Sequence, residues 1–275
     1  MDQSFLTKLK AKWNEGKFVS VGLDSDFSKL PNSLKHLPQE EAIYEFNKQI
    51  IDSTHDLVCA YKINSAFYEA DIKTWEAMVK TFRYLQEKYP EIPTILDAKR
   101  ADIGNTNQGY VKMAFEALKA DSITVHPYLG KEALGPFLAH ADKGIFVLVR
   151  TSNPGSDELQ GLEMDGRPLY QLVAENIAKN WNTQGNCAVV VGATYPNELK
   201  AVRQIIGDMP ILIPGIGVQG GDLESSVKNG LNSEKQGIII ASSRSIIYAS
   251  NGEDFAQAAR TETEKLHNQI LSFRT

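Results

Sequence analysis

The sequence predicts an α/β protein with the fold of a (β/α)8 TIM barrel and an N-terminal helix. Eight short runs rich in β-branched residues alternate along the chain with longer segments of helical periodicity. Strict alternation of this kind indicates a parallel sheet with both faces covered. Eight strands in 275 residues give about 34 residues for each strand, helix and pair of loops. A doubly wound open sheet is the structural alternative, but eight units of this size favour a closed barrel.

The predicted elements begin with an amphipathic helix in residues 1–17, where Phe5, Leu9 and Trp13 recur at helical spacing. The strands are expected in eight short apolar ranges: Phe18–Asp24, Leu57–Asn64, Thr94–Lys99, Ser122–His126, Ile145–Thr151, Ala188–Thr194, Ile211–Gly215 and Gly237–Ser242. Amphipathic helices are expected between them, among others at residues 40–55, 68–89 and 166–183. Because no linker divides the chain, we expect residues 1–275 to form a single barrel domain.

The composition is that of an ordinary globular protein, with 42% apolar and 23% charged residues. Its net charge of −5 argues against a nucleic-acid-binding surface over the whole chain. The longest apolar stretches are four or five residues, far below the ~20 that span a bilayer, and the N-terminus lacks a signal-peptide core. Cys59 and Cys187 lie in apolar runs and are expected as buried thiols in a reducing compartment. We therefore expect a soluble, cytoplasmic protein that binds neither nucleic acid nor membranes.

Three predicted strands deliver charged side chains to the same end of the barrel. Side chains two positions apart share a face of a strand, so Asp97 and Lys99 enter the barrel mouth together from the third strand. By the same alternation the first strand delivers Asp24 and the second delivers Lys62. Structural ion pairs are the alternative explanation, but burying several charges costs several kcal/mol per ion. Four charges at the end where barrel enzymes carry their active sites therefore favour a functional site.

A phosphate site is predicted beside these charges, where the seventh and eighth strands end. The seventh strand is followed by PGIGVQGGD (residues 214–222), and glycines let backbone amides approach a phosphate. Asp222 is expected to cap the next helix, and Ser242, Ser243 and Arg244 end the eighth strand beside this loop. A glycine-rich turn is the alternative for the loop alone. Loops after strands seven and eight form the common phosphate site of this barrel, so a phosphorylated ligand is expected.

The sequence contains no pattern that predicts a cofactor or a metal. Its five histidines lack HExxH-type spacing, and its two cysteines form no CxxC pair. No GxGxxG follows the first strand, and the GxSxG and P-loop patterns are also missing. His126 ends the fourth strand, where we expect a structural histidine with satisfied hydrogen bonds. We therefore expect no cofactor and no metal site.

The segment LDAKRADIGNT (residues 96–106) contains a D-x-K-x-x-D motif formed by Asp97, Lys99 and Asp102. It resembles the signature of the orotidine 5′-phosphate decarboxylase family, in its longer-chain, mainly bacterial branch. The likeness extends to VGLD in the first strand, YKIN in the second, VRTSNPGS after the fifth, PGIGVQGGD after the seventh and SSRSI after the eighth. Ala101 stands where this branch usually has glycine.

The resemblance implies decarboxylation of orotidine 5′-phosphate to uridine 5′-phosphate (UMP), the last step of de novo UMP biosynthesis, without metal or cofactor. In the family pattern Lys99 donates the proton to C6 of the pyrimidine, and Asp97 lies next to the departing carboxylate. Asp102 completes the charge network from the neighbouring subunit, and Thr106 also reaches the partner's ligand. The resemblance therefore implies a homodimer.

The resemblance also implies how the nucleotide is held. Asp24 and Lys62 match the residues that contact the ribose hydroxyls and join the charge network. Ser152 matches the serine that bonds the pyrimidine edge. Gln219 and Arg244 match the residues that grip the phosphate.

Two other functions remain open for this sequence. D-x-K-x-x-D is shared with sugar-phosphate enzymes of the same superfamily, which would act with magnesium and lose activity with a chelator. The third possibility is a barrel that binds a phosphometabolite without catalysis and tolerates loss of Lys99 with little effect on binding. The segment TSNPG favours the decarboxylase, because a pyrimidine edge needs a polar partner in that loop.

Overall fold

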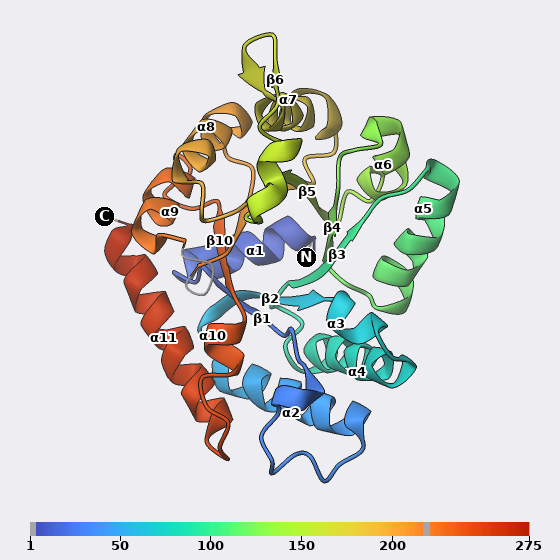
Figure 1. The fold of residues 1–275 in the computed structure, drawn as a ribbon, viewed down its shortest axis with the longest axis vertical. Helices are drawn as coiled ribbons and strands as arrows, with labels where there is room; N and C mark the ends of the chain where they lie inside the picture. Colours follow the sequence, from blue (N-terminus) through green and yellow to red (C-terminus); the bar gives the residue numbers. More distant parts are fainter. Residues whose placement is uncertain (1–3, 217–220, 275) are drawn as a thin grey trace.

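Eight parallel strands close into a barrel that the helices surround (Figure 1). The computed structural model describes residues 4–216 and 221–274. In order around the barrel, the strands are β1 (Val19–Gly22), β10 (Ile238–Ser242), β9 (Ile211–Pro214), β8 (Cys187–Val191), β5 (Gly144–Arg150), β4 (Ser122–Val125), β3 (Thr94–Arg100) and β2 (Val58–Asn64). Val19 of β1 lies in register with Ile240 of β10, so the sheet has no free edge. The predicted (β/α)8 barrel is confirmed, and the open-sheet alternative is wrong.

The strands fall where the apolar runs predicted them, with ends that differ by a few residues. They are rich in Val and Ile and almost wholly buried, as expected for parallel strands covered on both faces. β1 ends at Gly22 rather than at Asp24, because the chain beyond it turns into a loop. Leu23 still donates its N–H to the carbonyl of Lys62 at 2.8 Å, which keeps this loop on the sheet.

The predicted N-terminal helix, α1 (Phe5–Asn14), closes one end of the barrel. Its buried face includes Phe5, whose ring meets Phe146 edge-on with centroids 5.5 Å apart. A Cβ on Gly144, the first residue of β5, would lie 2.4 Å from the Phe5 ring. Trp13 Nε1 donates to the carbonyl of Ile238, the first residue of β10, at 2.9 Å. α1 therefore covers the amino ends of the strands and leaves their carboxyl ends open.

The remaining helices lie outside the strands or in the loops. They are α2 (Gln39–Thr54), α3 (Ala66–Glu69), α4 (Ile72–Lys88), α5 (Gly104–Val111), α6 (Gly130–Leu138), α7 (Leu169–Asn176), α8 (Pro196–Ile206), α9 (Leu223–Gly230), α10 (Arg244–Ile247) and α11 (Phe255–Phe273). π-Helical turns η2 (Lys112–Ala117) and η4 (Ile177–Trp181) extend α5 and α7, and η1 (Phe27–Lys29) and η3 (Pro154–Glu158) are 3-10 turns. The helix expected over residues 68–89 is split, because Asp71 caps α4 by accepting from Lys73 N at 2.9 Å.

A short hairpin after β5 was not predicted. It pairs β6 (Glu163–Met164) with β7 (Arg167–Pro168), and Asp165 and Gly166 form the two-residue loop. Both loop residues have positive φ, 53° and 72°. Asp-Gly is the usual sequence of a turn with positive φ at both positions, so the dipeptide itself was a usable signal.

The two cysteines, Cys59 and Cys187, are buried free thiols, as expected. In the described ranges 4–216 and 221–274, no helix combines the length and apolar character needed to cross a membrane.

Arg203 of α8 is buried and ties together four backbone carbonyls near the amino ends of β9 and β10. Its guanidinium donates to the carbonyls of Gly230 at 2.7 Å, Met209 at 2.7 Å, Gly207 at 2.5 Å and Gly237 at 2.9 Å. Burial lowers the pKa of Arg203 to about 10, which still leaves it charged at neutral pH. The side chain therefore joins the end of α9 to the segments before β9 and β10, and it is the partner of the buried Gly230 carbonyl.

We expect Arg203→Met to lower the free energy of unfolding by about 3 kcal/mol, because it removes four hydrogen bonds from a charged donor and leaves the buried Gly230 carbonyl unpaired. The change is measured by denaturant unfolding. Lys200→Met is the matched control, since Lys200 is exposed on the same helix. Equal stability of the two variants would contradict a structural role for Arg203.

Candidate active site

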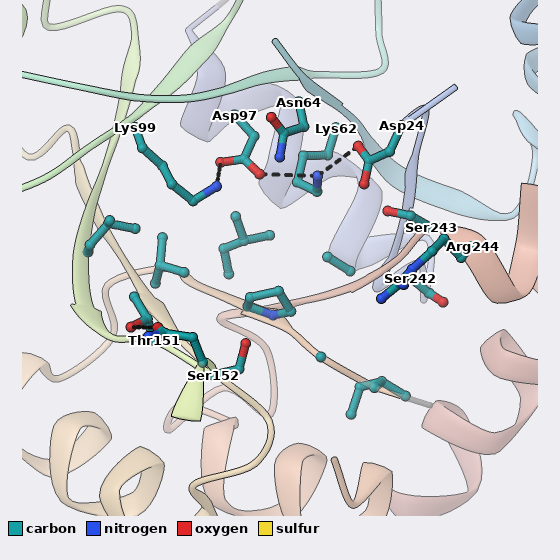
Figure 2. Close-up of a pocket in the computed structure, with 18 of the residues that line it drawn as sticks. Asp24, Lys62, Asn64, Asp97, Lys99, Thr151, Ser152, Ser242, Ser243 and Arg244 are labelled. Atoms are coloured by element: carbon teal, nitrogen blue, oxygen red, sulfur yellow. Dashed lines mark hydrogen bonds and ion pairs between the residues drawn. The ribbon is translucent and has the colours of Figure 1, made fainter. Parts of the chain in front are cut away.

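A cavity of about 540 Å³ opens at the carboxyl ends of the strands (Figure 2). Its charged and polar lining comes from the ends of β1, β2, β3 and β10 and from the loop after β5. These residues include Asp24, Lys62, Asn64, Asp97, Lys99, Thr151, Ser152, Asn153, Gln160, Ser242, Ser243, Arg244 and Ser245. Apolar side chains of β5, β8 and β9 form the floor: Leu148, Val190 and Leu212. A pocket of this size with a few converging polar groups is typical of a small-molecule site.

The four charged side chains expected at the barrel mouth form one continuous charge network. Lys62 Nζ lies 3.3 Å from Asp24 Oδ1 and 3.2 Å from Asp97 Oδ2. The other oxygen of Asp97, Oδ1, lies 2.7 Å from Lys99 Nζ. Figure 2 shows the alternating order Asp24, Lys62, Asp97, Lys99 across the top of the pocket. The predicted convergence of these residues is confirmed.

The inner residues of this charge network are buried, whereas its outer end is exposed. The side chains of Lys62 and Asp97 are 6% and 10% exposed, whereas that of Lys99 is 48% exposed. Burial works to lower the pKa of Lys62, but Asp24 and Asp97 outweigh it and raise the pKa above its ordinary value. Burial works to raise the pKa of Asp97, but Lys62 and Lys99 outweigh it and lower the pKa to about 2. Lys62 and Asp97 are therefore both ionised at neutral pH.

Lys99 reaches the pocket through an irregular backbone. Its φ is +46°, in the left-handed region that side chains other than glycine seldom adopt. The register between β3 and β4 shifts here, since Leu96 pairs with Ile123 but Arg100 pairs with Val125. The simple alternation that placed Asp97 and Lys99 on one face therefore does not describe Lys99. Backbone strain of this kind is concentrated at functional sites, where the surrounding structure holds it in place.

Thr124 of β4 supports this irregular segment and was missed in the sequence. Its hydroxyl donates to Asp97 Oδ1 at 2.9 Å and accepts from the backbone N–H of Lys99 at 2.9 Å. The pair of bonds fixes the carboxylate and the strained backbone relative to each other. Position on the inward face of β4 was the available signal, but it does not distinguish this threonine from an ordinary core residue.

The predicted phosphate site lies where β9 and β10 end. Ser242, Ser243 and Arg244 line it as expected, and Asp222 caps α9 by accepting from Glu224 N at 3.1 Å. Gly22 of β1 packs so closely here that a Cβ on it would lie 1.9 Å from Ser243 Oγ. Gln219, the other expected phosphate ligand, lies outside the described residues.

The comparison with known proteins identifies the family. The sequence profile of the orotidine 5′-phosphate decarboxylase / HUMPS family matches residues 19–259. The chain belongs to this family. Two curated relatives, both named orotidine 5′-phosphate decarboxylase, are 49% identical over 97% of this chain and 98% of the relative (Cellvibrio japonicus) and 48% identical over 98% and 99% (Ralstonia pickettii).

Solved structures agree with this assignment. The Leishmania donovani OMP decarboxylase is 35% identical, with a TM-score of 0.85 and 98% of both chains covered. The UMP synthase of the same organism is 36% identical, with a TM-score of 0.87, and the match covers 98% of this chain and 56% of that one. The orotidine 5′-phosphate decarboxylase fold therefore extends over nearly the whole chain.

Two motif residues of this decarboxylase family do not lie in the pocket of their own chain. Asp102 follows β3, and its Oδ1 accepts from the N–H of Ile103 at 2.6 Å. Its backbone is held by Asn107, which donates to the Asp102 carbonyl at 2.7 Å and accepts from the Asp102 N–H at 2.9 Å. Thr106 is exposed on α5. Within the described part of the chain, Lys99 is paired with Asp97 and not with Asp102.

His126 has the structural role that was expected of it. Its Nε2 lies 3.1 Å from the carbonyl of Ala101, and its Nδ1 accepts from the N–H of Tyr128 at 3.3 Å. The ring thus holds the backbone beside Asp102 and leaves neither nitrogen for catalysis.

Proposed function

We propose that this decarboxylase converts orotidine 5′-phosphate to UMP, the last step of de novo pyrimidine biosynthesis, with Lys99 as the proton donor to C6. The observation that supports this role of Lys99 is its position at the exposed end of the Asp24–Lys62–Asp97–Lys99 charge network, inside the pocket of a decarboxylase fold. The curated relatives at 47–49% identity support the substrate, since all are named orotidine 5′-phosphate decarboxylase.

In the proposed reaction, the bond from C6 to the carboxylate carbon breaks and carbon dioxide leaves. The electron pair stays on C6 as a vinylic carbanion that no adjacent carbonyl can delocalise. A fixed ammonium at this position stabilises the developing charge without solvent reorganisation and then supplies the proton. Asp97, 2.7 Å from Lys99 Nζ, holds the ammonium in place. Asp97 would also lie near the substrate carboxylate, where repulsion could raise the energy of the bound substrate.

The rest of the nucleotide is assigned to the remaining pocket residues. Asp24 and Lys62 would contact the ribose hydroxyls, Ser152 the pyrimidine edge, and Arg244 with Gln219 the phosphate. The phosphate is remote from C6, so its binding energy can be used to position the ring and close loops. Residues 151–161 are one candidate closing segment. The other that the sequence suggested, residues 214–222, includes residues 217–220, which lie outside the described residues.

We expect the purified protein to decarboxylate orotidine 5′-phosphate at an undiminished rate in the presence of a chelator. The loss of orotate-ring absorbance measures turnover. Activity that appears only with added magnesium would favour the sugar-phosphate type of enzyme. Absence of turnover under both conditions, with retained nucleotide binding, would favour a binding protein.

We also propose that the active unit is a homodimer in which Asp102 and Thr106 reach the partner's site. Neither residue lines the pocket of its own chain, and large apolar side chains are exposed beside them. Ile103 is 60% exposed and Tyr128 is 81% exposed, although such side chains are usually covered. His126 bonds the segments that carry them, so they form one surface. A partner covering this surface would bring its own Asp102 towards Lys99.

We expect Lys99→Ala and Asp102→Ala chains, each inactive alone, to recover activity when they are co-expressed. A mixed dimer has one site with both residues intact, so random pairing restores about a quarter of the wild-type sites. The readout is orotidine 5′-phosphate turnover by the purified mixture. Failure to exceed the activity of either parent would contradict a shared site.

Two broader assignments accompany this function. We propose that residues 1–275 form a single barrel domain, supported by the family match over residues 19–259 and by α1, which packs on the barrel. We propose a cytoplasmic location, supported by the two buried free thiols.

A further inference from the structure

Arg150, the last residue of β5, points away from the pocket and into the loop that follows. We call residues 151–160 the Ser152 loop. The guanidinium is buried, with a side chain 3% exposed. Its Nη1 donates to Ser156 Oγ at 3.1 Å, and its Nη2 lies 2.6 Å from Asp157 Oδ1. A buried cation is costly unless its partners are well placed, so this arrangement needs a reason.

The same guanidinium connects the Ser152 loop to the next barrel unit. It stacks on the ring of Tyr195, 3.8 Å from the ring centroid, and Tyr195 precedes α8. The Tyr195 hydroxyl lies 3.1 Å from Ser156 Oγ, so Ser156 is bonded from two sides. The planar guanidinium provides both the hydrogen-bonding fork and the stacking face, which a lysine ammonium cannot do. Arg150 thus connects the middle of the Ser152 loop to Tyr195, the residue that precedes α8.

Gln160 fastens the ends of the Ser152 loop to each other. Its Oε1 accepts from the backbone N–H of Thr151 at 2.8 Å, and its Nε2 donates to Thr151 Oγ1 at 2.8 Å. Thr151 Oγ1 in turn donates to Asn153 Oδ1 at 2.6 Å. Gln160 lines the pocket and was missed in the sequence, because its partner is nine positions earlier in an irregular loop.

Ser152 itself has little room to adjust. The residue opposite it is Gly192, just after β8, whose N–H donates to the carbonyl of Arg150 at 2.8 Å. A Cβ on Gly192 would lie 2.7 Å from Ser152 Cβ and 2.9 Å from Ser152 Cα. Ser152 therefore packs directly against bare backbone on one side and faces the pocket on the other (Figure 2). Its position depends on where the loop is held.

We propose that Arg150 is a positioning residue for recognition of the pyrimidine: through Ser156, Asp157 and Tyr195 it holds the Ser152 loop so that Ser152 meets the base. Arg150 does not touch the substrate. The inference rests on the proposed contact between Ser152 and the pyrimidine edge. An Arg150 variant is therefore expected to lose affinity for the base alone, because the proposed ribose and phosphate contacts come from residues on other strands.

The test compares two inhibitors of the full-length enzyme: UMP, which carries the base, and ribose 5-phosphate, which does not. Arg150→Lys keeps the charge but loses the fork and the stacking face. It should raise the inhibition constant of UMP by about tenfold, the effect of one good hydrogen bond, and change that of ribose 5-phosphate less than about twofold. In a Ser152→Ala background, the same substitution should add less than about twofold. Arg167→Lys, on the exposed hairpin, is the control and should change neither constant.

The outcomes separate this inference from the proposed function. Equal increases for both inhibitors would overturn it, because Arg150 would then act on the whole barrel. If Ser152→Ala raises the inhibition constant of UMP but Arg150→Lys does not, the role of Arg150 alone is overturned. If Ser152→Ala leaves the inhibition constant of UMP unchanged, both the proposed contact of Ser152 with the base and the inference about Arg150 are overturned. If Arg150→Lys does not fold, Asp157→Asn gives the same comparison, since Asp157 is 68% exposed. The Asp157→Asn substitution must raise the inhibition constant of UMP and leave that of ribose 5-phosphate unchanged.

Discussion

Replacing Lys99 with alanine is expected to reduce kcat for decarboxylation by about 10⁴-fold or more. The substitution removes the proposed proton donor, which is the half-exposed cation at the outer end of the Asp24–Lys62–Asp97–Lys99 charge network. General acid catalysis and preorganised electrostatic stabilisation each contribute a factor of this general size or somewhat smaller. UMP binding should change far less, because the proposed contacts to the base, ribose and phosphate remain.

The measurement is turnover of orotidine 5′-phosphate, together with UMP affinity by titration. Lys88→Ala is the matched control, since Lys88 is exposed at the end of α4, away from the pocket. A Lys99→Ala enzyme with abundant turnover would remove Lys99 from the mechanism. A variant that binds UMP poorly as well would indicate that Lys99 chiefly shapes the pocket.

Replacing Asp97 with asparagine should cause the second largest loss, about 10³-fold in kcat. The new amide keeps the shape of the carboxylate but leaves Lys62 and Lys99 as neighbouring cations without the charge between them. Because Lys62 is buried, the substitution should also lower the free energy of unfolding, by about 3 kcal/mol. Asp24 still pairs with Lys62 and keeps the loss at the lower end of what such deletions cost.

The pH dependence of this stability loss provides a separate check. The pKa of Asp97 is lowered to about 2 in the folded protein, from an ordinary value of 3.8. Its stabilisation is therefore fully present above about pH 4 and is lost as the pH falls towards 2. The stability difference between wild type and Asp97→Asn should shrink over this interval in denaturant unfolding. Asp142→Asn, which changes an exposed carboxylate, is the control. A difference that stays constant down to pH 2 would contradict a charge-based role.

The barrel and most of the site could be predicted because both depend on local patterns. Buried parallel strands require continuous runs of Val and Ile, as in β8 and β10. A closed barrel brings the carboxyl ends of all strands to one rim, so Asp24, Lys62 and Asp97 had to meet. The resemblance to the decarboxylase family supplied the roles that geometry alone does not provide.

The remaining features depend on contacts between distant segments. The positive φ of Lys99 follows from the register shift against β4, which no single-strand pattern encodes. Thr124 and Gln160 are defined by partners in other loops or strands, and neither lies in a recognisable motif. The position of Asp102 outside the pocket of its own chain is a further example. Its expected neighbour is the Lys99 of a second subunit, which a single chain does not contain.

The seam between β1 and β10 has a consequence for how the chain folds. Val19 is among the first barrel residues to be synthesised, and its register partner Ile240 lies in the last barrel strand of the sequence. The indole of Trp13 likewise bonds the carbonyl of Ile238. The first strand therefore has one unpaired edge until β10 has been synthesised. Contacts between such distant positions are slow to form, which makes closure of this seam a late event in folding. With Trp75 and Trp181 replaced by phenylalanine, the fluorescence of Trp13 would report on that event.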